Sequence, residues 1–155
     1  MAAVVADTSP LIALLQIGHL SILKSLFIEV QIPPAVAREA APSLPERPSW
    51  LVVRELTEPI GSDILRASLG RGESETLGLA FEVRAELVIL DDRPARRLAI
   101  GLGLPVVGTM GVLLRAKRTG IIPAVRPLLE QLLRAGFRLS PAIREKVLTD
   151  AGEQG

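Results

Sequence analysis

The chain has 155 residues, a formal net charge of +1 and no cysteine. This length predicts one domain with a substantial core, and the lack of cysteine excludes disulfides and thiolate metal sites, so a cytoplasmic location is expected. The nearly balanced charge argues against a general polyanion-binding surface, and no apolar run approaches the roughly 20 residues that span a bilayer. Hydrophobic residues make up 48% of the chain, which fits a sheet buried on both faces or a homodimer that hides further surface.

Strand-like and helix-like segments alternate along the chain. In the first part of the chain we expect a strand at 3–7, a helix ending at Gly18, a helix at 19–26, a strand at 28–32, a helix beginning at Pro34, a loop at 42–49 and an edge strand at 50–56. Helices at 60–69 and 73–85, a strand at 87–91, a helix at 93–102 and a strand at 105–107 should follow. From 109 onward we expect helices that break at Gly120, Pro123, Gly136 and Pro141. Such alternation is typical of a parallel sheet with helices on both faces. The sequence therefore predicts an α/β fold, a three-layer α/β/α sandwich with a central, mainly parallel sheet of four or five strands. It should form a single domain over residues 1–150, with a flexible tail at 151–155.

Two acidic positions directly follow apolar runs that we expect to be strands. Asp7 closes the run 2–6, and Asp91 closes the run 87–90, with Asp92 next to it. The carboxyl ends of parallel strands meet at one edge of a sheet, so Asp7 and Asp91 should converge there. Asp92 would point elsewhere if the strand continued, but beyond the strand end it can also turn inward. Carboxylates grouped in this way are the ligands that hard divalent cations select.

Helix phase ranks two glutamates that follow Gly72. At about 100° per residue, Glu73 shares a face with Leu77 and Phe81, on the stripe expected to pack against the sheet. Glu75 points roughly the opposite way. Because an unpaired buried carboxylate is costly, an acid at the head of this stripe needs a partner. Glu73 is therefore the preferred site residue, and Glu75 is the reserve.

Each of these acids also has an ordinary structural interpretation. Asp7 can cap a helix, Glu73 can complement a helix dipole, and Glu39, three residues beyond Val36, can be a solvated charge. Taken together, two acids that end apolar strands and a third that heads an inward stripe favour a functional site.

Five ordered motifs carry a resemblance to a known family. They are Val5–Ile12, Ile32–Glu39, Gly72–Glu75, Leu90–Arg96 and Val107–Gly111. In this order they span nearly the whole chain and resemble the PIN-domain proteins, in particular the short toxin-like members similar to VapC-type ribonucleases.

The resemblance implies a ribonuclease that uses Mg²⁺ or Mn²⁺ held by carboxylates. By motif, the catalytic and metal-binding acids would be Asp7, Glu39, Glu73 and Asp91, with Asp92 as a further metal ligand and Glu75 in reserve. Two positions depart from the family pattern, because the third acid is commonly Asp and the fourth is here doubled. The implied partners are RNA, a small antitoxin protein and a second copy of the chain.

Polar and basic residues beside these acids are the expected substrate-binding groups. Thr8 or Ser9 can hydrogen-bond an acid or a metal-bound water, and Arg93 and Arg96 flank the acidic pair, where they can guide RNA phosphates or balance its charge. Thr109 opens a helix after a strand, so the N–H groups at this turn can hold a phosphate. A tight turn with a threonine cap is the alternative.

Two other functional classes fit parts of the sequence. A receiver-like phosphoacceptor domain would use Asp7, the pair Asp91 and Asp92, Thr109 and Lys117, although its acidic pair should follow the first strand. A non-catalytic interaction module would use the apolar helices of the C-terminal third as a docking surface.

Overall fold

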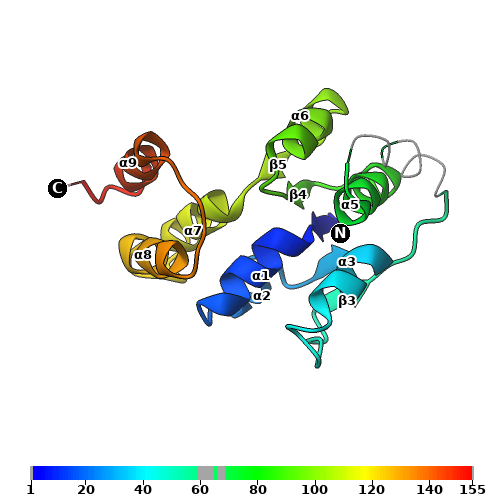
Figure 1. Cartoon of the computed structure of the whole chain (residues 1–155), viewed down its shortest axis with the longest axis horizontal. Helices are drawn as coiled ribbons and strands as arrows, with labels where there is room; N and C mark the ends of the chain where they lie inside the picture. Colours follow the sequence, from blue (N-terminus) through cyan, green and yellow to red (C-terminus); the bar gives the residue numbers. More distant parts are fainter. Residues whose placement is uncertain (1, 59–64, 66–68, 155) are drawn as a thin grey trace.

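The computed structural model describes residues 2–58, 65 and 69–154, which form a five-stranded, all-parallel sheet (Figure 1). The strands are Val4–Ala6 (β1), Val30–Ile32 (β2), Leu51–Val53 (β3), Leu87–Ile89 (β4) and Val106–Val107 (β5). Their order across the sheet is β3-β2-β1-β4-β5. The chain first builds outward from β1 through β2 to β3, and then continues on the other side of β1 with β4 and β5. The strand order therefore reverses between β1 and β4.

Helices connect and cover these strands. They are Thr8–Gln16 (α1), Ser21–Phe27 (α2), Pro34–Ala40 (α3), Arg71–Glu82 (α5), Arg93–Gly101 (α6), Thr109–Arg118 (α7), Arg126–Arg134 (α8) and Pro141–Asp150 (α9). The helix expected at 60–69 falls mostly outside the described residues. Over the described part of the chain, no single helix is long and apolar enough to cross a membrane, and α1 with α2 passes that test only as a pair bent by 119°.

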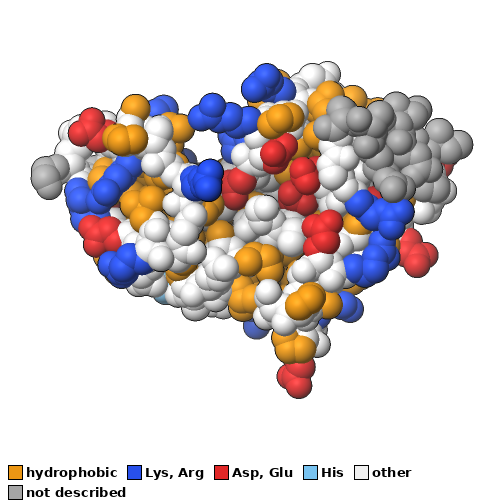
Figure 2. Space-filling model, viewed as in Figure 1, with side chains coloured by type: hydrophobic (Ala, Val, Ile, Leu, Met, Phe, Trp, Pro, Cys, Tyr) orange, Lys and Arg blue, Asp and Glu red, His pale blue; other side chains and the backbone are white. Residues whose placement is uncertain are grey.

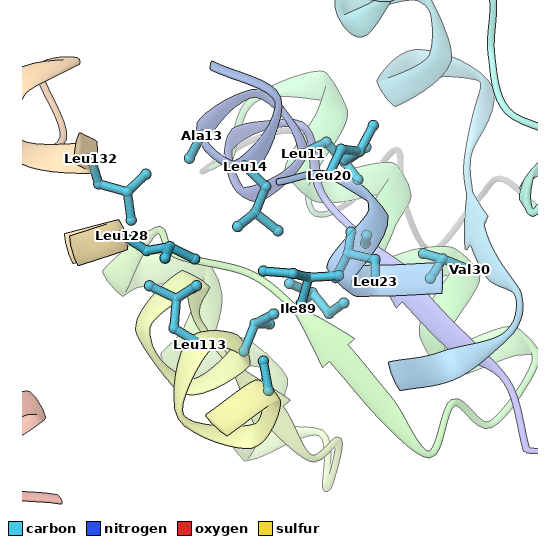
Figure 3. Close-up of a cluster of buried hydrophobic side chains, with 14 of the residues drawn as sticks. Leu11, Ala13, Leu14, Leu20, Leu23, Val30, Ile89, Leu113, Leu128 and Leu132 are labelled. Carbon is cyan, nitrogen blue, oxygen red and sulfur yellow. The ribbon is translucent and has the colours of Figure 1, made fainter. Parts of the chain in front are cut away.

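Alternate residues of the central strands enter two separate cores. Ala6 of β1 and Ile89 of β4 pack with α1, α2, α7 and α8, whereas Val5 and Val88 of the same strands pack with α5 and α6. In the larger core, leucines from α1, α2, α7 and α8 gather around Ile89 (Figure 3). Two cores on opposite faces of one parallel sheet confirm the predicted three-layer α/β/α sandwich.

Residues with special backbone preferences set several helix boundaries. Pro34 occupies the first turn of α3, where its missing N–H costs nothing. Gly18, with a φ of 74°, follows the end of α1, and Gly136, with a φ of 100°, follows α8. Glycine adopts this left-handed conformation without the steric cost of a Cβ atom, so it ends a helix readily.

All five expected strands are shorter in the structure, and the differences in β2 and β4 have local causes or consequences. Ile28 has a φ of 68° and is 76% exposed, so residues 28 and 29 form a turn and β2 begins only at Val30. β4 ends at Ile89, before the acidic pair, so neither Asp91 nor Asp92 belongs to the strand.

The expected core stripe of α5 also differs from the structure. Leu77 is fully buried, but Phe81 is 60% exposed. The buried arc of this helix also takes in Gly72, Thr76 and Leu79, so its centre is rotated away from the line that joins Leu77 to Phe81. Phe81 therefore lies at the margin of the buried face.

A flexible tail was expected at 151–155, and the described residues of this segment form hydrogen bonds with the rest of the domain. The Glu153 carboxylate accepts hydrogen bonds from the backbone N–H groups of Val125 and Arg126 at 2.7 and 2.9 Å. It also forms a 2.9 Å salt bridge with Lys117 of α7. These contacts fasten the described end of the tail to α7 and to the start of α8. In α8 itself, Leu129 and Leu132 belong to the core, so core packing accounts for them.

Candidate active site

Asp7 lies at the carboxyl end of β1, beside β4, where the strand order reverses. Its backbone N–H donates to the Ile89 carbonyl at 2.9 Å, and α1 begins at the next residue, Thr8. The Asp7 side chain is only 4% exposed. In open α/β sheets, ligands bind in the crevice outside the carboxyl ends of the strands at such a reversal point. The fold thus places a buried acid where these sheets bind ligands.

The surroundings of Asp7 disfavour its negative charge. Burial is the largest influence and raises the pKa of Asp7 to about 6, although a hydrogen bond from the backbone of Thr8 opposes it. The charges of Glu73 and Glu39 raise this pKa further. The hydroxyl of Thr76 donates to Oδ1 of Asp7 at 3.3 Å and lowers the pKa without cancelling the rise. Asp7 is therefore a buried acid whose ionised form is poorly compensated.

Glu39 reaches the same place from α3. Its Oε2 accepts a 2.6 Å hydrogen bond from the Thr8 hydroxyl, which orients the carboxylate toward the end of β1. The carboxylate also lies against Gly72 of α5, where a Cβ atom would be only 2.6 Å from Oε2. A glycine at position 72 therefore leaves the room that Glu39 occupies.

Glu73 and Asp92 complete the group. Burial raises the pKa of Glu73, and the charges of Asp92 and Glu39 raise it further. Asp92 caps α6, because its Oδ2 accepts from the Ala95 N–H at 3.0 Å. Electrostatic repulsion thus links four carboxylates, Asp7, Glu39, Glu73 and Asp92, which we call the acidic cluster. Acidic side chains gather in a hollow of the surface in this region (Figure 2).

Asp91 and Glu75, two further expected ligands, have other hydrogen-bond partners. The Asp91 carboxylate accepts from the backbone N–H of Thr109 at 2.8 Å and from its hydroxyl at 2.6 Å, and so anchors the start of α7. Oε1 of Glu75 accepts from the Ala35 N–H at 2.9 Å, in the first turn of α3. Asp7, Glu39 and Glu73 thus influence one another's charge, and Asp92 influences Glu73, whereas the contacts of Asp91 and Glu75 are with Thr109 and Ala35.

The expected substrate-binding residues also differ in their placement. Thr109 is fully buried, with both of its donors engaged by Asp91, so it is not available to a phosphate. Thr8 is engaged by Glu39, whereas Ser9 is exposed at the start of α1. Arg93 and Arg96 line a groove that also reaches Asp91.

Sequence reasoning missed Thr76 as a site residue. The Thr76 side chain is fully buried and its hydroxyl contacts both Asp7 and, at 2.7 Å, the carbonyl of Gly72. The available signal was its position three residues after Glu73, which puts a polar side chain on a helix face that is otherwise apolar or small.

The donor chemistry of the acidic cluster fits a hard divalent cation. Its ligand atoms are all carboxylate oxygens, and none of the four acids forms a salt bridge within the described parts of the chain. As they stand, no three acidic or histidine side chains among the described residues are close enough to share one ion. Because clustered like charges repel, a cation bound among them would offset the repulsion that, after burial, raises the pKa values of Asp7 and Glu73.

Fold and site together define the class of protein: a parallel α/β/α domain with a carboxylate cluster at the reversal point of its sheet that forms no salt bridge with another described residue. The family model described as DUF3368: PIN domain matches residues 3–153, so the chain belongs to the PIN-domain family. PIN domains are generally nucleases. No curated protein and no solved structure matches the chain. The family expected from the sequence motifs is confirmed.

The topology is incompatible with a receiver-like domain. Receiver domains have the strand order 2-1-3-4-5, whereas this sheet has the order β3-β2-β1-β4-β5. Lys117, which a receiver would need beside its acids, is instead bonded to Glu153 and to the carbonyl of Ala151 at the C-terminal end.

Proposed function

We propose that the protein is a Mg²⁺- or Mn²⁺-dependent endoribonuclease and the toxin component of a toxin–antitoxin pair. One observation carries the nuclease proposal: in a PIN domain, four carboxylates that form no salt bridge with other described residues lie at the point where open α/β sheets bind ligands. Hydrolysis of a phosphodiester at this place fits both the family and the chemistry of the side chains.

Asp7, Glu39, Glu73 and Asp92 are the residues that would hold the cation. Bound there, Mg²⁺ or Mn²⁺ would stabilise charge on the scissile phosphate and make a bound water more acidic. Asp92 keeps Oδ1 free for this purpose, because its cap on α6 uses only Oδ2.

Other side chains hold these acids in place. The Thr8 hydroxyl fixes the orientation of Glu39, and the Thr76 hydroxyl does the same for Asp7. The single hydroxyl proton of Thr76 is shared between Asp7 at 3.3 Å and the Gly72 carbonyl at 2.7 Å, so Thr76 links Asp7 to the first turn of α5, which carries Glu73. Positioned ligands of this kind lose less entropy when a cation and a substrate bind.

An antitoxin and a second copy of the chain are the partners that we propose. Exposed large hydrophobic side chains support a protein partner, because such groups favour burial: Ile28, Phe81, Ile100, Leu102 and Ile143. An antitoxin segment that covers the acidic cluster would have to bring its own positive charge, since no cationic side chain in the described ranges forms a salt bridge with the cluster.

The test is cleavage of a panel of RNAs by the purified full chain, with Mn²⁺ or with EDTA. We expect Mn²⁺-dependent cleavage by the native chain and its loss in Asp7→Asn, which removes the charge but keeps the shape. Lys146→Ala, an exposed change on α9, is the control and should cleave normally. An inactive native chain that still captures a protein partner would support the interaction-module alternative.

A further inference from the structure

The C-terminal helix α9 helps to form a groove with a volume of about 800 Å³. Leu139 and Ser140, just before α9, and Ile143 in its first turn line this groove, and residues of α6 line it as well. The groove reaches Asp91, which is followed directly by Asp92 of the acidic cluster. In Figure 1, α9 and the C-terminus lie at one end of the molecule. The position of α9 therefore sets the width of an approach to the cluster.

α9 buries few side chains against the rest of the domain. Of its ten residues, only Val147 and Leu148 are buried, and the others are exposed or half-buried. α7, which has the same length, buries four. A segment with few buried apolar contacts detaches at a lower free energy than the whole domain unfolds. Apolar packing alone thus holds α9 weakly.

The connection that leads into α9 has the properties of a hinge. After α8, the N–H of Phe137 still donates to the Leu132 carbonyl at 2.9 Å. The backbone N–H groups of residues 138–140 donate no hydrogen bond to any described residue. Hinges are a few residues between elements that absorb a change in backbone angles. A rotation in residues 138–140 breaks no hydrogen bond that these N–H groups donate, so it is accessible at low cost.

Polar contacts that converge on Glu153 hold the other end of α9. The Glu153 carboxylate accepts from the N–H groups of Val125 and Arg126, and its side chain is only 13% exposed. Lys117 donates to this carboxylate and also to the Ala151 carbonyl. The Arg126 guanidinium donates to the Glu153 carbonyl at 2.8 Å. We call these contacts the Glu153 clasp, and because three of them end on one carboxylate, a single side chain controls most of the clasp.

We propose that α9 is a hinged wall of the groove and that the Glu153 clasp holds this wall closed. Release of the carboxylate lets α9 swing about residues 138–140 and away from α6, at the cost of exposing the two side chains that it buries. The movement itself does not depend on the proposed nuclease function. Its effect on RNA cleavage does, since that effect treats the acidic cluster as the place of cleavage.

Distances between spin labels test the movement directly. The chain has no cysteine, so labels can be attached at Arg97→Cys on α6 and Glu145→Cys on α9, two exposed positions. Pulsed electron spin resonance should give one narrow distance distribution when the clasp is intact. Glu153→Ala removes the acceptor of three hydrogen bonds, so it should raise the ratio of open to closed molecules about tenfold or more. This change should appear as a second, longer distance while the helix content measured by circular dichroism stays the same.

A matched control and a second release variant are available. Asp150→Asn breaks the ion pair with Lys146, which lies within α9, so its distances should equal those of the native chain. Lys117→Met removes the ammonium of the clasp but keeps an apolar stem, so it should produce the same longer distance as Glu153→Ala. An unchanged distribution in both release variants overturns the proposal. So does a longer distance that comes with a loss of helix content, because α9 has then unfolded rather than swung.

Hydrogen exchange of the native chain gives an independent measurement. The N–H groups of Val147 and Leu148 should have protection factors at least about tenfold lower than those of Val88 and Ile89 in β4, because α9 opens without the sheet. Equal protection of the helix and the strand would show that α9 is released only when the whole domain unfolds, and would overturn the proposal.

Cleavage in Mn²⁺ measures the consequence of the movement. Closed molecules reduce the fraction that is competent to bind, so Glu153→Ala should raise kcat/KM for a folded RNA about threefold or more over Asp150→Asn. A longer distance with an unchanged kcat/KM refutes the control of access by α9. If the native chain cleaves RNA but the release variants show no longer distance, the nuclease proposal stands and the hinged wall is refuted. If the native chain does not cleave RNA but Glu153→Ala shows the longer distance, the hinged wall stands and the nuclease proposal is refuted.

Discussion

The carboxylate of Glu39 lies against the α-carbon of Gly72. A Cβ atom on Gly72 would be 2.6 Å from Oε2 and 2.7 Å from Oε1 of Glu39, closer than real Cβ contacts come. Gly72 directly precedes Glu73 on α5, and Glu39 belongs to α3, so this contact is where two helices bring their acids together. The space that the glycine leaves free is therefore part of the site.

Gly72→Ala should separate activity from stability. The added methyl group must push the Glu39 carboxylate aside, and a displacement of this size in a positioned group can cost about 100-fold in kcat/KM. Stability should change by no more than about 1 kcal/mol, because alanine is the better helix former and the group that moves is the end of a flexible side chain. RNA cleavage and urea unfolding measure the two effects. Gly101→Ala, which has nothing within 4 Å of the new methyl group, is the control, and an equal loss in both variants would contradict the prediction.

Asp7→Asn should make the metal-free protein more stable at neutral pH. The pKa of Asp7 rises from 3.8 to about 6 on folding, so the folded state holds this proton more tightly than the unfolded state does. Stability is then greatest below the unfolded pKa and falls as the pH rises toward 6, by up to about 3 kcal/mol in total. The Asp7→Asn variant does not lose stability in this way, because asparagine has no carboxyl group to ionise. In urea titrations with EDTA, the variant should gain stability over the native chain near pH 7.5 and show little difference near pH 4, and a native chain that is the more stable of the two near pH 7.5 would rule this out.

The two adjacent aspartates should respond in opposite ways to loss of charge. Asp92→Asn keeps an oxygen for the cap on α6 but removes a negative charge beside Glu73, so we expect activity to fall about 100-fold with little change in stability. Asp91→Asn leaves only one oxygen for the two donors of buried Thr109, so we expect a loss of about 1–3 kcal/mol in stability. Parallel measurements of kcat/KM and of unfolding free energy decide the question. Greater activity loss in Asp91→Asn than in Asp92→Asn would restore Asp91 as the ligand.

Divalent cations should stabilise the folded protein through the acidic cluster. A ligand that binds only the folded state stabilises it by about 2.7 kcal/mol when its concentration is 100 times Kd. Mn²⁺ should therefore raise the Tm of the native chain, and EDTA should reverse the rise. The Glu73→Gln variant should lose most of this rise in Tm. The Glu75→Gln variant should keep it, because the Glu75 carboxylate accepts a hydrogen bond from the Ala35 N–H instead. An equal Mn²⁺ effect in both variants would count against the assignment of Glu73.

Removal of Glu153 should loosen the C-terminal helices. Burial raises the pKa of this acid, but the backbone N–H groups of Val125 and Arg126, together with Lys117, outweigh burial and hold the pKa below its usual value. The contribution to stability is therefore present above the unfolded pKa and is lost as the pH falls through the folded pKa. Glu153→Gln should cost about 0.5–2 kcal/mol near neutral pH, the size of a lost helix cap, and less in acid. Thermal unfolding at both pH values measures the difference, with the exposed Glu145→Gln as control.

The order of the elements was accessible from local patterns. The alternation of apolar runs and amphipathic segments indicated the parallel sheet, and prolines and glycines marked helix ends such as Pro34 and Gly18. The lengths of the strands were overestimated, because an apolar run can continue past the last residue that pairs with a neighbouring strand. β4, for example, ends at Ile89. Phe81 was misplaced for a related reason: the buried face of α5 depends on how the helix is rotated against the sheet, which the period of a single helix does not specify.

By itself, the sequence determined which acids could meet, since Asp7 and the pair Asp91 and Asp92 follow strands that share one edge of the sheet. The tertiary structure alone decided which of them do. Asp91 accepts two hydrogen bonds from Thr109, 18 residues further along, and Glu75 accepts one from Ala35 at the start of α3, 40 residues earlier. The direction of a side chain beyond the end of a strand, or on the edge of a helix, depends on the donors that the fold places nearby. Those donors come from distant segments, so the contacts of Asp91 and Glu75 follow from the folded chain and not from local sequence.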